Sequence, residues 1–89
     1  MNNLNSILIE GKVKNIVKES GFSLVIIVSN RYKKTGKYIE KEVNTIGVKM
    51  EERFTSYLAE GNNIRVVGRI QADGINAVII AEHVERRAA

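Results

Sequence analysis

The 89-residue chain has no cysteine, no proline and no tryptophan, and it has a single histidine. Without cysteine, the protein has no disulfide scaffold, no thiol catalysis and no cysteine-ligated zinc. His83 alone is too little for a metal centre or a Ser-His-Asp triad, because both need several polar side chains in one place. The absence of proline and of low-complexity sequence predicts one folded domain over residues 1–89, with no linker.

Long apolar runs and targeting segments are also missing. The longest apolar runs, residues 24–28 and 77–81, have five residues each, whereas a membrane-spanning helix needs about 20. The opening Met-Asn-Asn-Leu-Asn lacks the basic and apolar regions of a secretory signal. We therefore expect a soluble, cytoplasmic protein with no membrane contact. Apolar residues make up 44% of the chain, which is typical of a folded globular domain.

No catalytic motif assembles from the residues. The chain has no serine elbow, no Walker glycine loop and no metal-ligand spacing. The paired carboxylates Glu51 and Glu52 are adjacent on a predicted helix, so their side chains point apart. We expect a protein that is not an enzyme, with no catalytic residue, no metal and no cofactor.

Positive charge is concentrated in one short segment. Lysine and arginine outnumber aspartate and glutamate by 14 to 10, a formal net charge of +4. Within residues 31–41, Glu40 is the only acid, so this segment carries the whole net charge. Its cations are Arg31, Lys33, Lys34, Lys37 and Lys41. Such a local basic element favours binding of a polyanion such as nucleic acid. The alternative is a solvated hairpin whose lysines only prevent strand pairing with other chains.

Short β-rich runs alternate with turn residues along the chain. They predict five strands, over residues 6–13, 22–29, 38–48, 64–70 and 75–84. The sequence Lys-Lys-Thr-Gly-Lys at residues 33–37 places a glycine turn between the second and third strands, so the basic segment forms the tip and flanks of a hairpin.

One helix is predicted between the third and fourth strands, over residues 50–59. Met50, Phe54, Tyr57 and Leu58 fall on one helical face, and Gly61 supplies a C-terminal cap. An all-β chain of five strands, with one helix between strands three and four, is the layout of the OB-fold barrel. The second and third strands of that barrel form its usual oligonucleotide-binding face. The basic hairpin falls on these two strands.

Several short motifs follow one another along the chain. Residues 5–11 read Asn-Ser-Ile-Leu-Ile-Glu-Gly, and Tyr-Leu precedes residues 61–70, Gly-Asn-Asn-Ile-Arg-Val-Val-Gly-Arg-Ile. Asn-Arg-Tyr at residues 30–32 opens the basic hairpin, and residues 81–85 read Ala-Glu-His-Val-Glu. In this order and spacing the motifs resemble the bacterial single-stranded DNA-binding protein family over most of the chain. The resemblance implies an OB-fold that binds single-stranded DNA with little sequence preference, in replication, repair or recombination, as a homo-oligomer.

The chain departs from that family in three respects. Residues 85–89, Glu-Arg-Arg-Ala-Ala, are basic where family members continue into an acidic tail, so partner recruitment by such a tail is not implied. The connection at residues 71–74 is short. Stacking residues are few, although base–aromatic stacking contributes ~1–3 kcal/mol per base. Over residues 41–48, neither face of the third strand has an aromatic, whichever register holds. The two faces are Lys41, Val43, Thr45 and Gly47, or Glu42, Asn44, Ile46 and Val48.

The candidate nucleic-acid-binding residues centre on the hairpin. Tyr32 and Tyr38 flank its tip, where they either stack on bases or pair with each other across the hairpin. The remaining candidates are cations that either contact phosphates or face solvent: Arg31, Lys33, Lys34, Lys37 and Lys41 on the hairpin, Lys12 and Lys14 on the first strand, and Arg65 and Arg69 on the fourth. We expect weak binding per base, mainly through phosphates. Phe22, Phe54 and Tyr57 are expected in the core or its cap.

The sequence leaves several alternatives for the binding partner and for the oligomeric state. Single-stranded DNA is the expected ligand, with RNA as an alternative strand. A second interpretation is a primosomal-type OB-fold adaptor that binds a replication protein and has weak strand binding or none. A third is an interaction domain that has lost its binding face. The apolar residues 24–28, together with Val78, Ile79 and Ile80, exceed what one small barrel buries, which predicts a homodimer or homotetramer through the barrel sheets.

Overall fold

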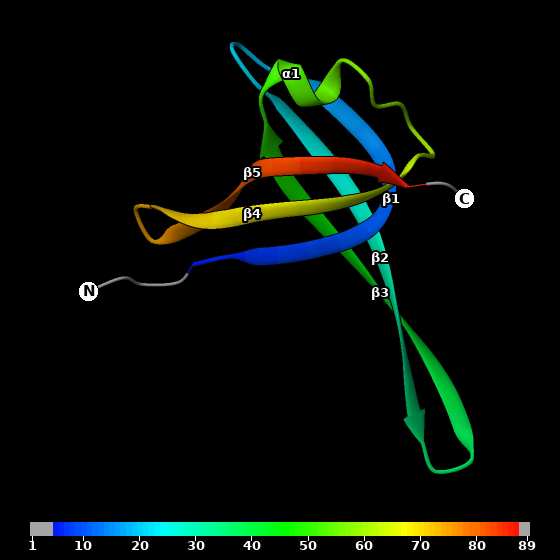
Figure 1. The fold of residues 1–89 in the computed structure, drawn as a ribbon. Helices are drawn as coiled ribbons and strands as arrows, with labels where there is room; N and C mark the ends of the chain where they lie inside the picture. The colour runs from blue at the N-terminus through cyan, green and yellow to red at the C-terminus, as the bar shows by residue number, and fades with distance from the viewer. Residues whose placement is uncertain (1–4, 88–89) are drawn as a thin grey trace.

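The computed structural model describes residues 5–87, and it contains five strands and one short helix (Figure 1). Residues 1–4 and 88–89 lie outside the described residues. They include most of the N-terminal stretch that lacks a secretory signal and the last two residues of the basic segment 85–89. The elements are β1 (Ile7–Lys18), β2 (Ser23–Thr35), β3 (Tyr38–Met50), α1 (Glu52–Thr55), β4 (Asn63–Asp73) and β5 (Asn76–Arg87). The predicted all-β class, with its helix between β3 and β4, is confirmed.

The strands close into a barrel in the order β1-β2-β3-β5-β4. All neighbouring strands are antiparallel except β3 and β5, which pair in parallel at Val48 and Lys49. Alternate side chains of each strand point inward, because successive residues of a strand face opposite sides. The buried core consists of Ile9, Val13, Val25, Ile27, Val48, Met50, Ile64, Val66, Ala81 and Val84 from the strands, with Phe54 and Leu58 from the segment around α1.

Two glycines allow neighbouring strands to approach closely. β1 pairs with β4 along its first half and with β2 along its second, and Gly11 lies where it changes partner. A Cβ at Gly11 would lie 2.5 Å from the carbonyl oxygen of Val28. A Cβ at Gly68 of β4 would lie 2.5 Å from the carbonyl oxygen of Ile80 on β5. A side chain at either position would therefore force the neighbouring backbone to shift.

The helix is shorter than the residue spacing predicted. It spans Glu52–Thr55, not residues 50–59, since Met50 still belongs to β3. The chain leaves the helix because it must return to β1: Gly61 N–H donates to the Val13 carbonyl at 2.7 Å, and Val13 N–H donates to the Asn62 carbonyl at 2.9 Å. Gly61, with φ of +90°, forms this turn rather than a helix cap. A tertiary contact thus overrides helical periodicity.

The β2–β3 hairpin extends well beyond the barrel, at the end away from α1 (Figure 1). Pairing of β2 with β1 ends at Val28, so residues 29–44 form a two-stranded ribbon. A two-residue loop closes this ribbon, and Gly36 adopts a φ of +60° at its first position. Glycine at that position is favoured in tight hairpins. The basic segment therefore forms a projecting arm, as the sequence predicted.

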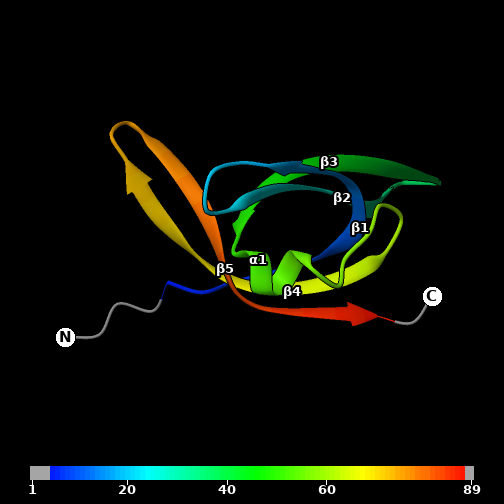
Figure 2. The same cartoon turned by 90° about the horizontal axis from the view of Figure 1, so that it is seen from above.

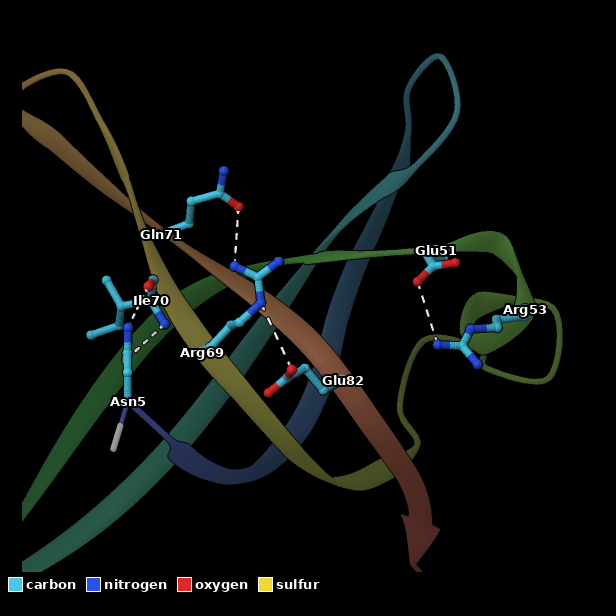
Figure 3. Close-up of polar contacts among 7 residues, drawn as sticks. All are labelled: Asn5, Glu51, Arg53, Arg69, Ile70, Gln71 and Glu82. Carbon is cyan, nitrogen blue, oxygen red and sulfur yellow. Dashed lines mark hydrogen bonds and ion pairs between the residues drawn. The ribbon is translucent and has the colours of Figure 1, made fainter. Parts of the chain in front are cut away.

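β4 and β5 form a second arm, which projects sideways from the barrel (Figure 2). The expected short loop at residues 71–74 is instead strand up to Asp73, and only Gly74 and Ile75 form the turn. Asn5 borders this arm at Ile70 (Figure 3). The Asn5 Nδ2 donates to the Ile70 carbonyl at 2.6 Å, and Ile70 N–H donates to Asn5 Oδ1 at 3.1 Å. The side-chain amide thus takes the place of a neighbouring strand.

Gly68→Ala is expected to lower the free energy of unfolding by about 1–3 kcal/mol, because the new methyl group overlaps the β5 backbone. Gly47→Ala is the matched control, since a Cβ there meets only side-chain atoms of Leu24 and Ile26, at 3.4 Å or more, and no backbone atom of a neighbouring strand within 4 Å. Urea unfolding followed by far-UV circular dichroism measures both. Equal losses of stability in the two variants would contradict the close-approach explanation.

Candidate nucleic-acid interface

The projecting hairpin has two faces of different chemistry. Partners across an antiparallel pair share a face, and each strand alternates between the two faces. One face, the Tyr32 face, consists of Asn30, Tyr32 and Lys34 on β2 and Ile39, Lys41 and Val43 on β3. Its two cations lie among aromatic and apolar side chains, and it has no carboxylate. It therefore carries an uncompensated positive charge.

The opposite face, the Tyr38 face, has as many cations but is electrically balanced. It consists of Ser29, Arg31, Lys33 and Thr35 on β2 and Tyr38, Glu40, Glu42 and Asn44 on β3. The register places Glu42 opposite Arg31 and Glu40 opposite Lys33. Opposite charges at such cross-strand positions contribute roughly 0.2–1 kcal/mol to the ribbon. On this face, each cation has a glutamate as its direct neighbour.

Tyr32 and Tyr38 do not pair with each other. Tyr32 lies opposite Lys41, and Tyr38 lies opposite Thr35, which puts the two rings on different faces. The alternative of a tyrosine pair across the hairpin is therefore wrong. Their side chains are 67% and 74% exposed, so both rings are accessible to a ligand.

The Tyr32 face continues without interruption onto the outside of the barrel. The register of β2 with β3 shows no shift between the hairpin tip and Ser23. The outward side chains that continue the Tyr32 face are Leu24, Ile26 and Val28 on β2 and Thr45, Gly47 and Lys49 on β3, together called the outer row. The apolar members are half-buried. This register also settles the open question for β3: Lys41, Val43, Thr45 and Gly47 face outward, while Ile46 and Val48 face the core.

Lys49 and Phe22 form the end of the outer row that is farthest from the hairpin tip. The Lys49 Nζ lies 4.1 Å from the centre of the Phe22 ring, within the distance of a cation–π contact. Phe22 is half-buried in the connection between β1 and β2 rather than fully in the core. Phe54 is buried as expected, whereas Tyr57 is 43% exposed and donates its hydroxyl to the Val84 carbonyl at 2.8 Å.

Lys12 and Lys14 lie at the base of the hairpin, beside the outer row. They line one groove together with Val13, Val28 and Asn30, where the ribbon leaves the barrel. The register of β1 with β2 shifts between Val13 and Asn15, so Lys14 is an extra residue in a β-bulge. Bulges commonly redirect a side chain at the edge of a sheet. The structure thus brings both lysines next to Asn30, the first residue of the Tyr32 face.

Arg65 and Arg69 lie on β4, where carboxylates neutralise them. Arg65 Nη2 lies 3.1 Å from Glu10 Oε1, and Arg69 Nε lies 3.7 Å from Glu82 Oε2 (Figure 3). Arg69 also donates to Gln71 Oε1 at 3.2 Å. The structure therefore does not bring these two arginines together with the hairpin cations into one uncompensated surface.

Sequence reasoning missed Lys49, Phe22 and the outer row. Lys49 is an even number of residues from Lys41 along β3, so the two side chains lie on the same face of the strand. The sequence therefore implied this shared face, but not which face points outward. The contact of Lys49 with Phe22 had no sequence signal, because it joins segments from different strands.

Among residues 5–87, no three His, Asp or Glu side chains come together as metal ligands. Within the same residues, no helix has the length and apolar character to cross a membrane.

The fold matches several solved structures over nearly their whole length. A Plasmodium falciparum SSB, solved in complex with ssDNA, aligns over 99% of this chain and 98% of its own, with a TM-score of 0.74 and 13% identity. A small single-stranded DNA-binding protein from Mycoplasma pneumoniae aligns over 93% of each chain, with a TM-score of 0.67 and 15% identity. PriB from Ralstonia solanacearum aligns over 97% of this chain and 100% of its own, with a TM-score of 0.71 and 10% identity.

These likenesses confirm the OB-fold. They also agree, at the level of the fold, with the resemblance to single-stranded DNA-binding proteins that the motifs indicated. No protein-family model matches the chain, and no curated protein sequence does.

The contact of Lys49 with Phe22 gives a direct spectroscopic prediction. The ε-methylene protons of Lys49 are expected to resonate upfield of those of the other lysines, because they adjoin the Nζ that lies over the Phe22 ring. Phe22→Leu should return them to the ordinary lysine position in a two-dimensional NMR spectrum. Phe54→Leu is the control, because the cation over Phe54 is Arg53 instead. A Lys49 shift that persists in Phe22→Leu would contradict the contact.

Proposed function

We propose that the protein binds single-stranded DNA with little sequence preference, through the basic hairpin and the outer row of the barrel, in DNA replication, repair or recombination. The observation that carries this proposal is one surface that joins the Tyr32 face to the outer row and to the groove lined by Lys12 and Lys14. Lysines and apolar side chains both lie along it, and its hairpin part has no carboxylate.

Each part of this surface suits one part of a single strand. The lysine amines attract phosphates and release condensed counterions, which supplies affinity that does not depend on sequence. Tyr32 and the apolar members of the outer row offer flat or aliphatic contacts to the bases, and such contacts tolerate any base. Few aromatics are present, so phosphates supply most of the affinity.

The solved structures that match the fold also support the proposal. The matched Plasmodium falciparum protein was solved with ssDNA, and the matched Mycoplasma pneumoniae protein is a single-stranded DNA-binding protein. The likeness to PriB keeps the adaptor function as the second candidate. An adaptor would bind a replication protein through the barrel and show little salt-sensitive affinity for DNA.

Anisotropy titration of a labelled oligo-dT, at several salt concentrations, tests the proposal. Affinity should fall as salt rises, by ~0.7 in log K per log unit of salt for each phosphate contacted. The variant Lys34→Ala/Lys37→Ala/Lys41→Ala should bind more than tenfold more weakly at low salt and show a shallower slope of log K against log salt concentration. The control Arg53→Ala/Arg86→Ala/Arg87→Ala removes the same charge from α1 and the end of β5. Absence of binding at low salt would overturn the proposal and favour the adaptor.

The proposal includes self-association through the barrel sheets as a homodimer or homotetramer. Leu8 is 60% exposed on the outside of β1, where it lies opposite Val67 of β4. Exposed apolar groups on a sheet are commonly covered by a second copy. In this arrangement several barrels share one strand, which raises the overall affinity.

Sedimentation velocity at micromolar concentration should therefore show a species larger than the 10.0 kDa chain. Leu8→Glu should shift the population to monomer, because it puts a charge into the apolar contact. Val43→Glu is the control, as Val43 is similarly exposed, at 58%, but lies on the hairpin. A monomer in the unaltered protein would refute self-association, whatever the DNA titration shows.

A further inference from the structure

The two faces of the hairpin have the same number of cations but present different surfaces to a polyanion. On the Tyr38 face, Arg31 and Lys33 each lie opposite a glutamate. On the Tyr32 face, Lys41 lies opposite Tyr32, and Lys34 lies opposite Ile39. The total charge of the segment does not reveal this difference, because it appears only when the residues are sorted by register.

We infer that the hairpin binds single-stranded nucleic acid with one face only: Tyr32 stacks on a base, Lys34 and Lys41 contact phosphates, and the Tyr38 face stays free of ligand. The inference rests on the proposed function and assigns it to particular residues. It also divides the two tyrosines and four cations of the hairpin strands into those that bind and those that do not; the fifth cation, Lys37, lies in the loop between the strands.

Electrostatics distinguishes the faces. A phosphate that approaches Arg31 or Lys33 also meets Glu42 or Glu40 at the neighbouring cross-strand position, so attraction and repulsion nearly cancel. A phosphate that approaches Lys34 or Lys41 meets no carboxylate on the same face. Counterion release, which drives binding of single strands, therefore comes mainly from the Tyr32 face.

The capacity to stack on bases also differs between the two faces. Tyr32 lies between Asn30 and Lys34 along β2 and opposite Lys41, so one face offers both a ring for a base and amines for the adjoining phosphates. The exposed Ile39 and Val43, on the same face, widen the apolar contact area. Tyr38 has Thr35 as its partner and the glutamates as its neighbours on β3.

Continuity with the barrel also favours the Tyr32 face. Followed toward the barrel, it joins the outer row and the groove lined by Lys12 and Lys14. The Tyr38 face, followed the same way, runs into the buried interior through Ile27 and Val25. A single-stranded nucleic acid bound to the Tyr32 face can continue along the outside of the barrel. One bound to the Tyr38 face would run into the closed core.

Charge-changing variants test the inference in the oligo-dT titration. Lys34→Gln/Lys41→Gln should weaken binding at least tenfold at low salt and reduce the salt slope by ~1.4, the equivalent of two phosphates. Arg31→Gln/Lys33→Gln/Glu40→Gln/Glu42→Gln removes every charge from the Tyr38 face and leaves the net charge unchanged. Its affinity and slope should stay within twofold and ~0.3, respectively, of the unaltered protein.

A second double variant controls for the lower net charge of Lys34→Gln/Lys41→Gln. Arg53→Gln/Arg86→Gln loses the same charge outside the hairpin and should keep most of the affinity. Circular dichroism of every variant confirms that the barrel is folded, so a loss of binding is not attributed to unfolding.

Tyrosine fluorescence supplies an independent measurement, because the chain has three tyrosines and no tryptophan. Stacking of a base on a tyrosine quenches its emission. Oligo-dT should quench the unaltered protein and the Tyr38→Phe variant, and the quenching should be largely lost in Tyr32→Phe. Tyr32→Ala should also weaken binding severalfold, while Tyr38→Ala should not.

The outcomes separate this inference from the proposed function. If the unaltered protein does not bind oligo-dT, both are overturned. If it binds, but the variants of the two faces lose affinity equally, or Tyr38 is the quenched residue, then only the one-face inference is overturned. If binding and quenching depend on the Tyr32 face alone, both are supported.

Discussion

The continuous pairing of β2 with β3 is the constraint on which the rest of the structure depends. Thirteen residue pairs, from Ser23 with Met50 to Thr35 with Tyr38, run without a register shift from the barrel to the tip of the arm. A slip by one residue would exchange the two faces of a strand. The same register buries Val25 and Val48 in the core and exposes the outer row. It also sorts the hairpin residues into one charge-balanced and one cationic face.

Whether a cation of this protein attracts phosphate depends on the carboxylates that lie beside it. Arg65 and Arg69 are as cationic as the hairpin lysines, but Glu10 and Glu82 lie within ion-pair distance of them. Exposed pairs of this kind add little stability, about 0–1 kcal/mol each. They do, however, remove attraction for phosphate from the β4 side of the barrel. On the Tyr32 face and beside it, at the base of the hairpin, Lys12, Lys34 and Lys41 have no carboxylate as a cross-strand partner.

Closing a barrel from so short a chain requires close backbone contacts. Gly11 and Gly68 allow two strands to pass neighbouring carbonyl oxygens where any side chain would collide. The return of residues 61–62 to Val13 ends the helix after one turn. The core is filled mainly by strands, and β2–β3 and β4–β5 project as two arms from the barrel (Figures 1 and 2). The proposed surface therefore combines a part on the barrel with a projecting ribbon.

Local patterns in the sequence predicted the order of strands and helix along the chain, the hairpin turn at Gly36 and the OB-fold, because strand alternation and turn glycines act between near neighbours. The basic arm was visible for the same reason, since its cations lie within eleven residues, 31–41. Sequence could not determine the end of the helix or which face of β3 points outward, because partners from distant strands settle both. Nor could it show that Arg65 is paired while Lys41 has no carboxylate on its face. The sequence gives the charge of each residue. Its neighbours across a strand pair depend on the register, and the register is determined only in the closed barrel.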